Sequence, residues 1–188
     1  MPDAAAPVVR RIVVSGSEST GKTTLARRLA EWLGTAWVPE HSRGYAEAKG
    51  APLTVLDVEP IARGTLAAED AATARARGGV LVLDTDLAST LVYARHYYDF
   101  HPAWVEAAWR ARPPALYLLC HPDVPWVPDG IRDQPRDRER LHALFAAQLA
   151  ASGAPVADVH GASWSAREAM ARAAVARVLG LQATRSAG

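Results

Sequence analysis

Five short apolar runs along the chain alternate with longer stretches in which apolar residues recur at helical spacing. The runs lie at about residues 11–15, 35–39, 80–84, 115–120 and 155–159. Short continuous apolar runs bounded by turn residues are typical of buried strands, and longer amphipathic stretches are typical of helices. We predict helices near residues 22–33, 57–77, 86–97, 102–111, 136–152 and 164–180. This alternation predicts a parallel sheet covered by helices on both faces.

The segment that follows the first run carries the most informative motif. It reads Gly-Ser-Glu-Ser-Thr-Gly-Lys-Thr and matches the phosphate-binding pattern G-x-x-x-x-G-K-[ST] between a strand and a helix. The glycines let consecutive N–H groups turn toward one anion, and the N-terminal end of the next helix adds positive potential. We therefore predict a three-layer α/β fold of the P-loop NTPase type, with ATP held by Gly16, Ser17, Glu18, Ser19, Thr20, Gly21, Lys22, Thr23 and Thr24.

Two side chains at the end of this motif have distinct expected tasks. Lys22 would reach the β and γ phosphates, and the Thr23 hydroxyl is an oxygen ligand of the kind that Mg²⁺ prefers. The 21 basic residues comprise nineteen Arg and two Lys, so a chain that otherwise uses Arg places a Lys here. We predict ATP and Mg²⁺ as cofactors and Lys22 as a catalytic residue.

Charged residues follow the second apolar run, and ligands of open α/β sheets bind at the carboxyl ends of strands. Glu40 lies where a helix begins, and it could accept a hydroxyl proton or hold ribose hydroxyls. Arg43 could hold a phosphate through its fork of donors. The structural alternative is a carboxylate at a helix start with a partner three residues on.

The third run ends in Asp84-Thr85-Asp86, as expected of a buried strand that presents a carboxylate to Mg²⁺. Asp84 is the candidate for that acid. Asp86 shares its face if the strand continues, but caps a helix if one starts there, and both possibilities stay open. Tyr97 belongs to an aromatic stretch that could stack on a flat base.

Residues 122–140 are rich in Pro, Asp and Arg, and they predict an Arg-containing lid. A flap that carries arginine onto a transferring phosphate while excluding water supplies charge stabilisation and positioning together. Arg132 is the first candidate for this catalytic role. Arg136 is the second candidate, and we expect it to contact ATP. Trp126 is expected to stack on a ligand ring, because such a segment has little core to join. Two further arginines are expected on a solvated helix face: Arg138 and Arg140.

The size, charge and cysteine content of the chain limit its expected domain number, partners and location. With 188 residues we expect one domain over residues 8–182, with flexible tails at 1–7 and 183–188. A net charge of +1 gives no electrostatic footprint for nucleic acid or an anionic membrane, so neither is a predicted partner. One cysteine, no signal segment and no apolar stretch near 18 residues favour a soluble cytoplasmic protein. The oligomeric state stays open.

In these motifs the chain resembles the ribosylnicotinamide kinase domain of the bifunctional NAD-biosynthesis regulator and its stand-alone P-loop relatives. The matching pieces, in order over residues 12–180, are the phosphate loop, Glu40-x-x-Arg43, Asp84-Thr85-Asp86, His101-Pro102 and Trp126-Val127-x-Asp129-Gly130-x-Arg132. The resemblance implies phosphate transfer from ATP to the 5′-hydroxyl of nicotinamide riboside, which gives nicotinamide mononucleotide. It implies that Trp126 stacks on the pyridine ring and that Glu40 or Asp84 serves the attacking hydroxyl. The expected acceptor-binding residues are Glu40, Arg43, Asp86, Tyr97, Trp126 and Asp129.

Two alternatives remain beside a small-molecule nucleoside as the substrate. One is another P-loop phosphotransferase that acts on a nucleoside, a nucleotide or a sugar. The other is an ATP-dependent regulatory switch, although a chain without Asn lacks the Asn-Lys-x-Asp guanine reader of GTPase switches. The adenylyltransferase and DNA-binding domains of the resembling regulators do not fit in 188 residues, so we predict neither activity. Adenine contacts are expected near residues 160–163.

Overall fold

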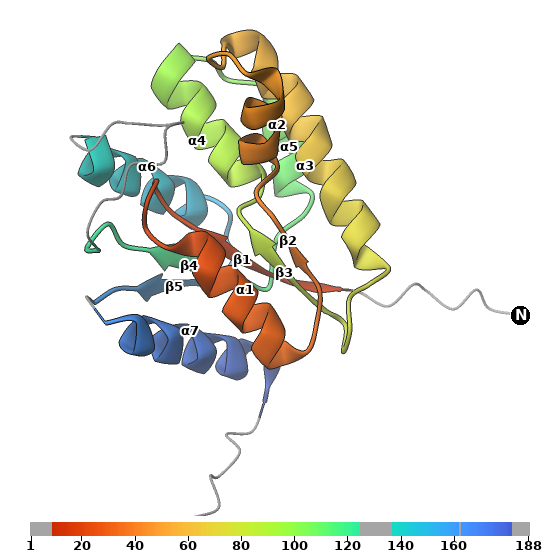
Figure 1. Cartoon of the computed structure of the whole chain (residues 1–188), viewed down its shortest axis with the longest axis vertical. Helices are drawn as coiled ribbons and strands as arrows, with labels where there is room; N and C mark the ends of the chain where they lie inside the picture. The colour runs from red at the N-terminus through yellow and green to blue at the C-terminus, as the bar shows by residue number, and fades with distance from the viewer. Residues whose placement is uncertain (1–8, 125–136, 162, 182–188) are drawn as a thin grey trace, which may run out of the picture.

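The fold is built on one parallel sheet of five strands (Figure 1). The computed structural model describes residues 9–124, 137–161 and 163–181. The strand order is β2-β3-β1-β4-β5, and every neighbouring pair is parallel. The predicted five-stranded parallel sheet of the P-loop fold is thereby confirmed, with strands β1 (Arg10–Ser15), β2 (Trp37–Val38), β3 (Val80–Asp84), β4 (Leu116–Cys120) and β5 (Val156–Val159).

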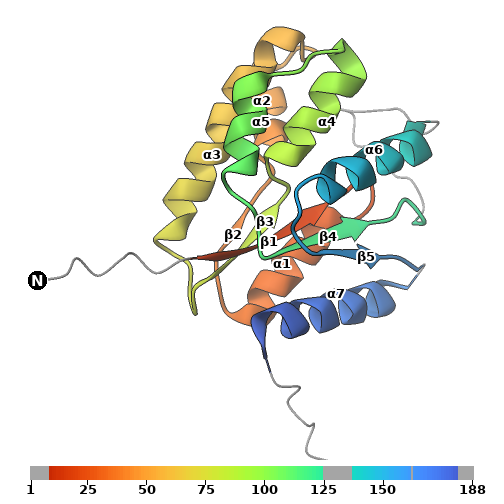
Figure 2. The same cartoon turned by 180° about the vertical axis from the view of Figure 1, so that it is seen from behind.

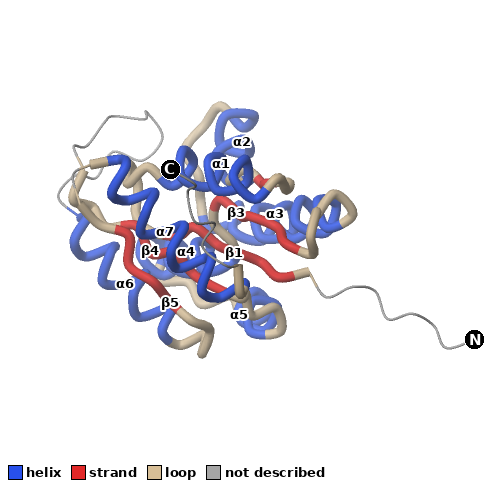
Figure 3. The backbone as a smooth tube through the Cα atoms, turned by 90° about the horizontal axis from the view of Figure 1, so that it is seen from below, coloured by secondary structure: helices blue, strands red, loops and turns tan. Residues whose placement is uncertain are grey.

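Helices cover both faces of the sheet, as Figures 1 and 2 show from opposite sides. The helix bounds are α1 (Lys22–Leu33), α2 (His41–Lys49), α3 (Val58–Thr73), α4 (Leu87–Tyr98), α5 (Ala103–Arg110), α6 (Arg138–Ala150) and α7 (Trp164–Leu179). Helices α1 and α7 share one buried cluster, and α3 to α6 share the other. Viewed from below in Figure 3, the strands form a band between helices. In the described segments, no helix is both long and apolar enough to cross a membrane.

Successive side chains of the central strands pack alternately into the two buried clusters, one on each face of the sheet. Ile12 and Val14 of β1 pack with α1 and α7, whereas Val13 between them packs on the opposite face. A strand that is buried on both faces reads as a continuous apolar run, which is why the runs predicted β1, β3 and β4 well. Strand β2 is shorter than its predicted run of 35–39. Helix α3 ends earlier than predicted, because the chain turns before β3 through two positive-φ glycines, Gly78 and Gly79.

Helix α2 is missing from the predicted helices, although the segment around Glu40 indicated where it begins. None of its residues is buried, so it has no apolar periodicity that a sequence pattern could reveal. Its far end is tied to the short 3₁₀ helix η1 (Val55–Asp57) by polar contacts to Asp57. The Tyr45 hydroxyl donates to this carboxylate at 3.0 Å, and Lys49 pairs with it. The Lys49 hydrogen bond, helped by the Thr54 amide, holds the pKa of Asp57 well below its usual range.

Asp86 caps helix α4 and joins a buried polar network. Its Oδ1 accepts the Ala88 amide at 3.0 Å, and its Oδ2 accepts the Tyr117 hydroxyl at 2.6 Å. Trp109 in turn donates its indole N–H to the Tyr117 oxygen at 2.8 Å. Burial raises the pKa of Asp86 to about 6 despite these bonds. The capping alternative for Asp86 is therefore observed, and its role in acceptor binding stays a prediction.

The raised pKa of Asp86 predicts a pH-dependent stability difference between the wild type and Asp86→Asn. A carboxyl whose folded pKa lies above its unfolded value of 3.8 stabilises the fold below pH 3.8 and loses that contribution as pH rises through 6. Asparagine caps helices equally well but does not titrate. From pH 4 to pH 7, we expect the difference in unfolding free energy to move in favour of the variant by about 2 kcal/mol.

Urea titrations at several pH values measure this difference directly. Asp70→Asn, at an exposed carboxylate on α3 that pairs with Arg112, is the matched control and should show little pH trend. A difference for Asp86→Asn that stays constant from pH 4 to pH 7 would contradict the assignment.

Candidate active site

The phosphate loop joins the carboxyl end of β1 to α1 and is held in its curled form from inside. Lys22 donates its ammonium to the Ser17 carbonyl at 2.6 Å, and the Thr20 hydroxyl donates to the same oxygen at 2.9 Å. Gly16 has φ +137°, and a Cβ there would lie 2.6 Å from the Cys120 carbonyl oxygen, so no side chain fits. The loop is thus pressed against β4, with Lys22 folded over it.

Asp84 at the end of β3 faces the first turn of α1. The Thr23 hydroxyl donates to Asp84 Oδ2 at 2.6 Å. The other carboxylate oxygen, Oδ1, is buried and has no hydrogen-bond partner within the described segments. Burial raises the pKa of Asp84, against the opposing effects of the Thr23 hydrogen bond and the Lys22 charge.

A hydroxyl and a carboxylate that keeps one buried oxygen unused form the oxygen donor set that suits Mg²⁺. The described residues contain no group of three or more His, Cys, Asp or Glu that could hold a metal ion by itself. Thr23 and Asp84 could therefore hold a magnesium ion that is otherwise coordinated by phosphate oxygens and water, as is usual for this ion in nucleotide sites.

Glu40 and Arg43, from the end of β2 and the start of α2, lie near Asp84. The Ser42 hydroxyl donates to Glu40 Oε1 at 2.5 Å. The charge of Glu40 raises the pKa of Asp84, and the charge of Arg43 lowers it, so both act on this carboxyl electrostatically. The structure thus brings the predicted acid and base, Glu40 and Arg43, within electrostatic reach of Asp84.

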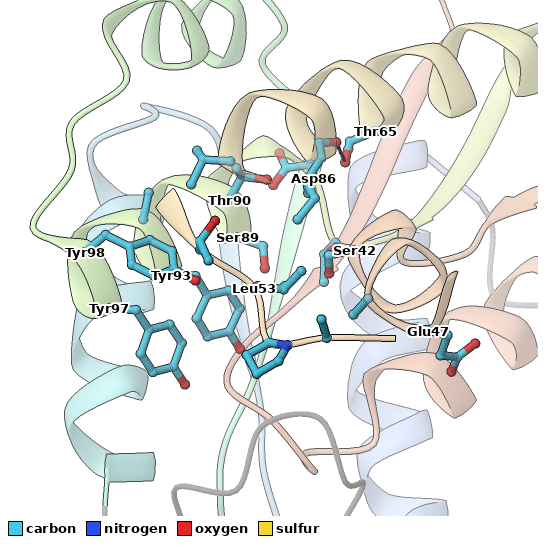
Figure 4. A pocket seen from close by; sticks show the side chains of 18 of the residues that line it. Ser42, Glu47, Leu53, Thr65, Asp86, Ser89, Thr90, Tyr93, Tyr97 and Tyr98 are labelled. Carbon is cyan, nitrogen blue, oxygen red and sulfur yellow. Dashed lines mark hydrogen bonds between the residues drawn. The ribbon is translucent and has the colours of Figure 1, made fainter. Parts of the chain in front are cut away.

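A cavity of about 590 Å³ adjoins this edge of the sheet, between α2, α3 and α4 (Figure 4). Thr85 and Asp86 connect it to the end of β3. The rings of Tyr93 and Tyr97 stack in its wall, with centroids 5.8 Å apart and planes at 8°. The charged residues in its described lining are two acids, Glu47 and Asp86, and no Lys or Arg lies in that lining.

Arg138 differs from the predicted solvated position. Its guanidinium is half-buried and donates to the Ser19 carbonyl of the phosphate loop at 3.3 Å and to the Val124 carbonyl at 3.2 Å. Its Nε is buried and has no partner in the described part of the chain. Because α6 begins at this residue, its first turn points at the loop. Arg140, as expected, is exposed.

Four predicted lid and acceptor residues lie outside the described residues: Trp126, Asp129, Arg132 and Arg136. Their roles stay predictions. Thr24 lies exposed in the first turn of α1, beside Thr23.

Arg167 is a structural element of the site that sequence reasoning missed. Its side chain, from α7, is 1% exposed. The guanidinium donates to the carbonyls of Thr20 at 3.1 Å, His121 at 3.3 Å and Gly161 at 3.4 Å, and it pairs with Asp123. It therefore fixes the phosphate loop to the ends of β4 and β5. Nothing in the Ala-rich pattern of α7 distinguishes this arginine from solvated ones.

The start of α7 also touches the phosphate loop. Gly21 has φ +80°, and a Cβ there would lie 2.1 Å from the Trp164 ring, which is itself 42% exposed. The segment after β5 is thus next to the loop, where adenine contacts were expected near residues 160–163. Residue 162 lies outside the described residues, and the adenine contacts stay a prediction.

Similar proteins include a curated relative and several solved structures. The chain is 28% identical over 165 residues to the trifunctional NAD biosynthesis/regulator protein NadR of Salmonella typhimurium, covering 85% of this chain and 40% of the relative. The chain therefore spans less than half the length of that protein.

Two crystal structures of NadR resemble the whole described fold. One, in complex with NR, has a TM-score of 0.78 and 27% identity over 96% of this chain and 52% of that chain. The other, in complex with NAD and AMP-PNP, has a TM-score of 0.76 and 26% identity over the same shares. Thymidylate kinase from Ehrlichia chaffeensis, with a TM-score of 0.64 and 14% identity over 92% of this chain and 100% of that chain, shares the fold alone.

The family itself is shown by a model that spans most of the chain. That model, AAA_28, is described as an AAA domain and matches residues 11–167, from β1 to the buried arginine of α7. The matched residues include the phosphate loop, the acid at the end of β3 and all five strands. The chain therefore belongs to this AAA domain family of P-loop nucleotide-binding proteins.

Proposed function

We propose that this chain is an ATP-dependent kinase that phosphorylates the 5′-hydroxyl of nicotinamide riboside to give nicotinamide mononucleotide. The observation that carries the proposal is the cavity beside Asp84, whose described lining combines tyrosines and acids and has no Lys or Arg. Nicotinamide riboside carries a positively charged, flat pyridine ring, and aromatic faces and carboxylates both attract such a cation. The likeness to NadR bound to NR supports the same assignment.

Charge favours a nucleoside over a nucleoside monophosphate as the acceptor. A phosphate on the acceptor needs cationic donors, most often arginine, whereas the charged lining residues Glu47 and Asp86 would repel it. Arg43 acts on Asp84, at the end of β3, and is not part of the cavity lining. The cavity volume of about 590 Å³ lies within the range of small-molecule sites.

The residues around the loop divide the work of phosphoryl transfer under this proposal. The loop amides, Lys22 and Arg138 would hold the triphosphate, and Thr23 and Asp84 would hold Mg²⁺. When bound, this ion neutralises charge that develops on the phosphate oxygens. Because Asp84 would be occupied by the metal ion, we assign the attacking hydroxyl to Glu40, whose charge acts on Asp84 as that of Arg43 does.

An acceptor panel tests the function itself. With Mg²⁺ and ATP, we expect nicotinamide riboside to yield ADP and nicotinamide mononucleotide, because its ring cation suits the cavity. Uncharged nucleosides should react more slowly, and nucleoside monophosphates more slowly still. Product masses and ADP release measure this order. Faster turnover of a nucleoside monophosphate or a sugar would contradict the proposed acceptor, and ATP hydrolysis that ignores every acceptor would favour a regulatory ATPase.

Lys22→Ala should reduce kcat by on the order of 10² to 10³, because it removes an oriented cation from the transferring phosphate. Arg28→Ala is the matched control, since Arg28 lies on the same helix but forms an exposed pair with Glu168 that contributes little. Steady-state kinetics of both variants decide the matter. Equal activity in the two variants would refute the assignment of the phosphate loop.

Comparison of Glu40→Gln with Asp84→Asn separates the base from the metal-side acid. We expect Glu40→Gln to lower kcat by about 10² to 10⁴ while the affinity for Mg-ATP is kept, because only proton transfer is lost. Asp84→Asn should instead raise the Mg²⁺ concentration needed for half-maximal rate. Calorimetry with Mg-ATP and magnesium titrations of the rate measure the two effects. The reverse pattern would make Asp84 the base.

A further inference from the structure

The phosphate loop contains an acid, Glu18, whose negative charge would repel the phosphates that such a loop binds. Glu18 is 6% exposed and lies between Gly16 and Lys22, inside the segment that would surround a triphosphate. A carboxylate aimed at the triphosphate would repel it strongly at this depth of burial. Within the described segments Glu18 has no ion-pair partner that would cancel its charge. The acid therefore needs an explanation other than triphosphate binding.

The Glu18 carboxylate is directed to the acceptor side of the loop. The Tyr97 hydroxyl donates to Glu18 Oε1 at 3.3 Å. Tyr97 lines the cavity and stacks on Tyr93, so it has a fixed plane from which to hold the acid. Glu18 thus contacts the tyrosine wall of the cavity at the Tyr97 hydroxyl, where the wall meets the phosphate loop.

The chemistry of the reaction places an acceptor hydroxyl at the same junction. A phosphoryl group can pass only if the attacking hydroxyl lies between the loop and the cavity, beside Asp84 and Glu40. In a ribonucleoside the 2′- and 3′-hydroxyls belong to the same ribose as the attacking 5′-hydroxyl, so they lie close to it. An ionised carboxylate has about four acceptor sites, and Tyr97 occupies one. The remaining sites suit hydroxyl donors of a ribose.

We propose that Glu18 is an acceptor-binding residue: its carboxylate, held by Tyr97, accepts a hydrogen bond from a ribose hydroxyl other than the one that is phosphorylated. The inference rests on the proposed nucleoside kinase function and changes the expected role of Glu18 from a triphosphate contact to a specificity contact. Under this inference the phosphate loop binds both substrates: its amides bind ATP, and the Glu18 side chain binds the nucleoside acceptor.

Glu18→Gln separates the two roles, because glutamine keeps the size of the side chain and removes its charge. We expect the KM for nicotinamide riboside to rise about ten- to hundredfold, as for a lost hydrogen bond to a charged group. Mg-ATP affinity by calorimetry should stay the same or become tighter, since a repulsive charge is lost. Tyr97→Phe, which keeps the ring, should raise the same KM by a smaller factor. Glu31→Gln, an exposed acid on α1, is the control and should leave all constants unchanged.

Acceptor analogues that lack the 2′- or the 3′-hydroxyl complete a thermodynamic cycle. For one of the two analogues, the wild type should lose about ten- to hundredfold in kcat/KM while Glu18→Gln loses little further. Equal losses in both enzymes for both analogues would overturn the inference, as would a tenfold weaker Mg-ATP affinity of Glu18→Gln with an unchanged acceptor KM. Failure of the proposed function looks different, because the wild type itself would not phosphorylate the nucleoside.

Discussion

The parallel register between β1 and β3 is the constraint on which the site depends. It pairs Val14 with Asp84, so β3 ends beside β1 just before the phosphate loop starts at Gly16. Because the loop then returns into α1, Thr23 meets Asp84 across 61 residues of sequence at 2.6 Å. A slip of one residue would move Asp84 to the other face of the sheet and separate the two groups. The buried apolar side chains of both strands hold this register.

The parts of the fold that can be read from sequence are those that depend on local pattern. Runs buried on both faces predicted the central strands β1, β3 and β4, and the glycines and lysine of the loop predicted its position. Asp84 could be selected because a strand end and an acid coincide. Helix α2 could not be predicted from the pattern, because a helix with no buried residue has no apolar periodicity. The cavity that α2 helps to enclose therefore had no signal of its own.

The remaining parts depend on contacts between distant residues. Arg167 lies 147 residues from Thr20, whose carbonyl it holds, and its neighbours in α7 resemble those of any solvated arginine. Arg138 reaches Ser19 across 119 residues. In both cases a guanidinium satisfies backbone carbonyls that the loop leaves unpaired, and buried carbonyls need such partners. That need appears only when the loop, β4 and the two helices are placed together.

The proposed function gives a reason for the way charge is divided across this edge of the sheet. Lys22 and Arg138 lie on the loop side, whereas the charged residues of the described cavity lining are acids. A triphosphate is anionic and a pyridinium nucleoside is cationic, so each would be drawn to the side that can react with it. Asp84 at the end of β3 and Glu40 just before α2 interact electrostatically at this edge, where we propose that the phosphoryl group crosses. Glu18 belongs to the loop by sequence but contacts Tyr97 of the cavity wall, so under our proposal its charge acts on the acceptor and not on ATP.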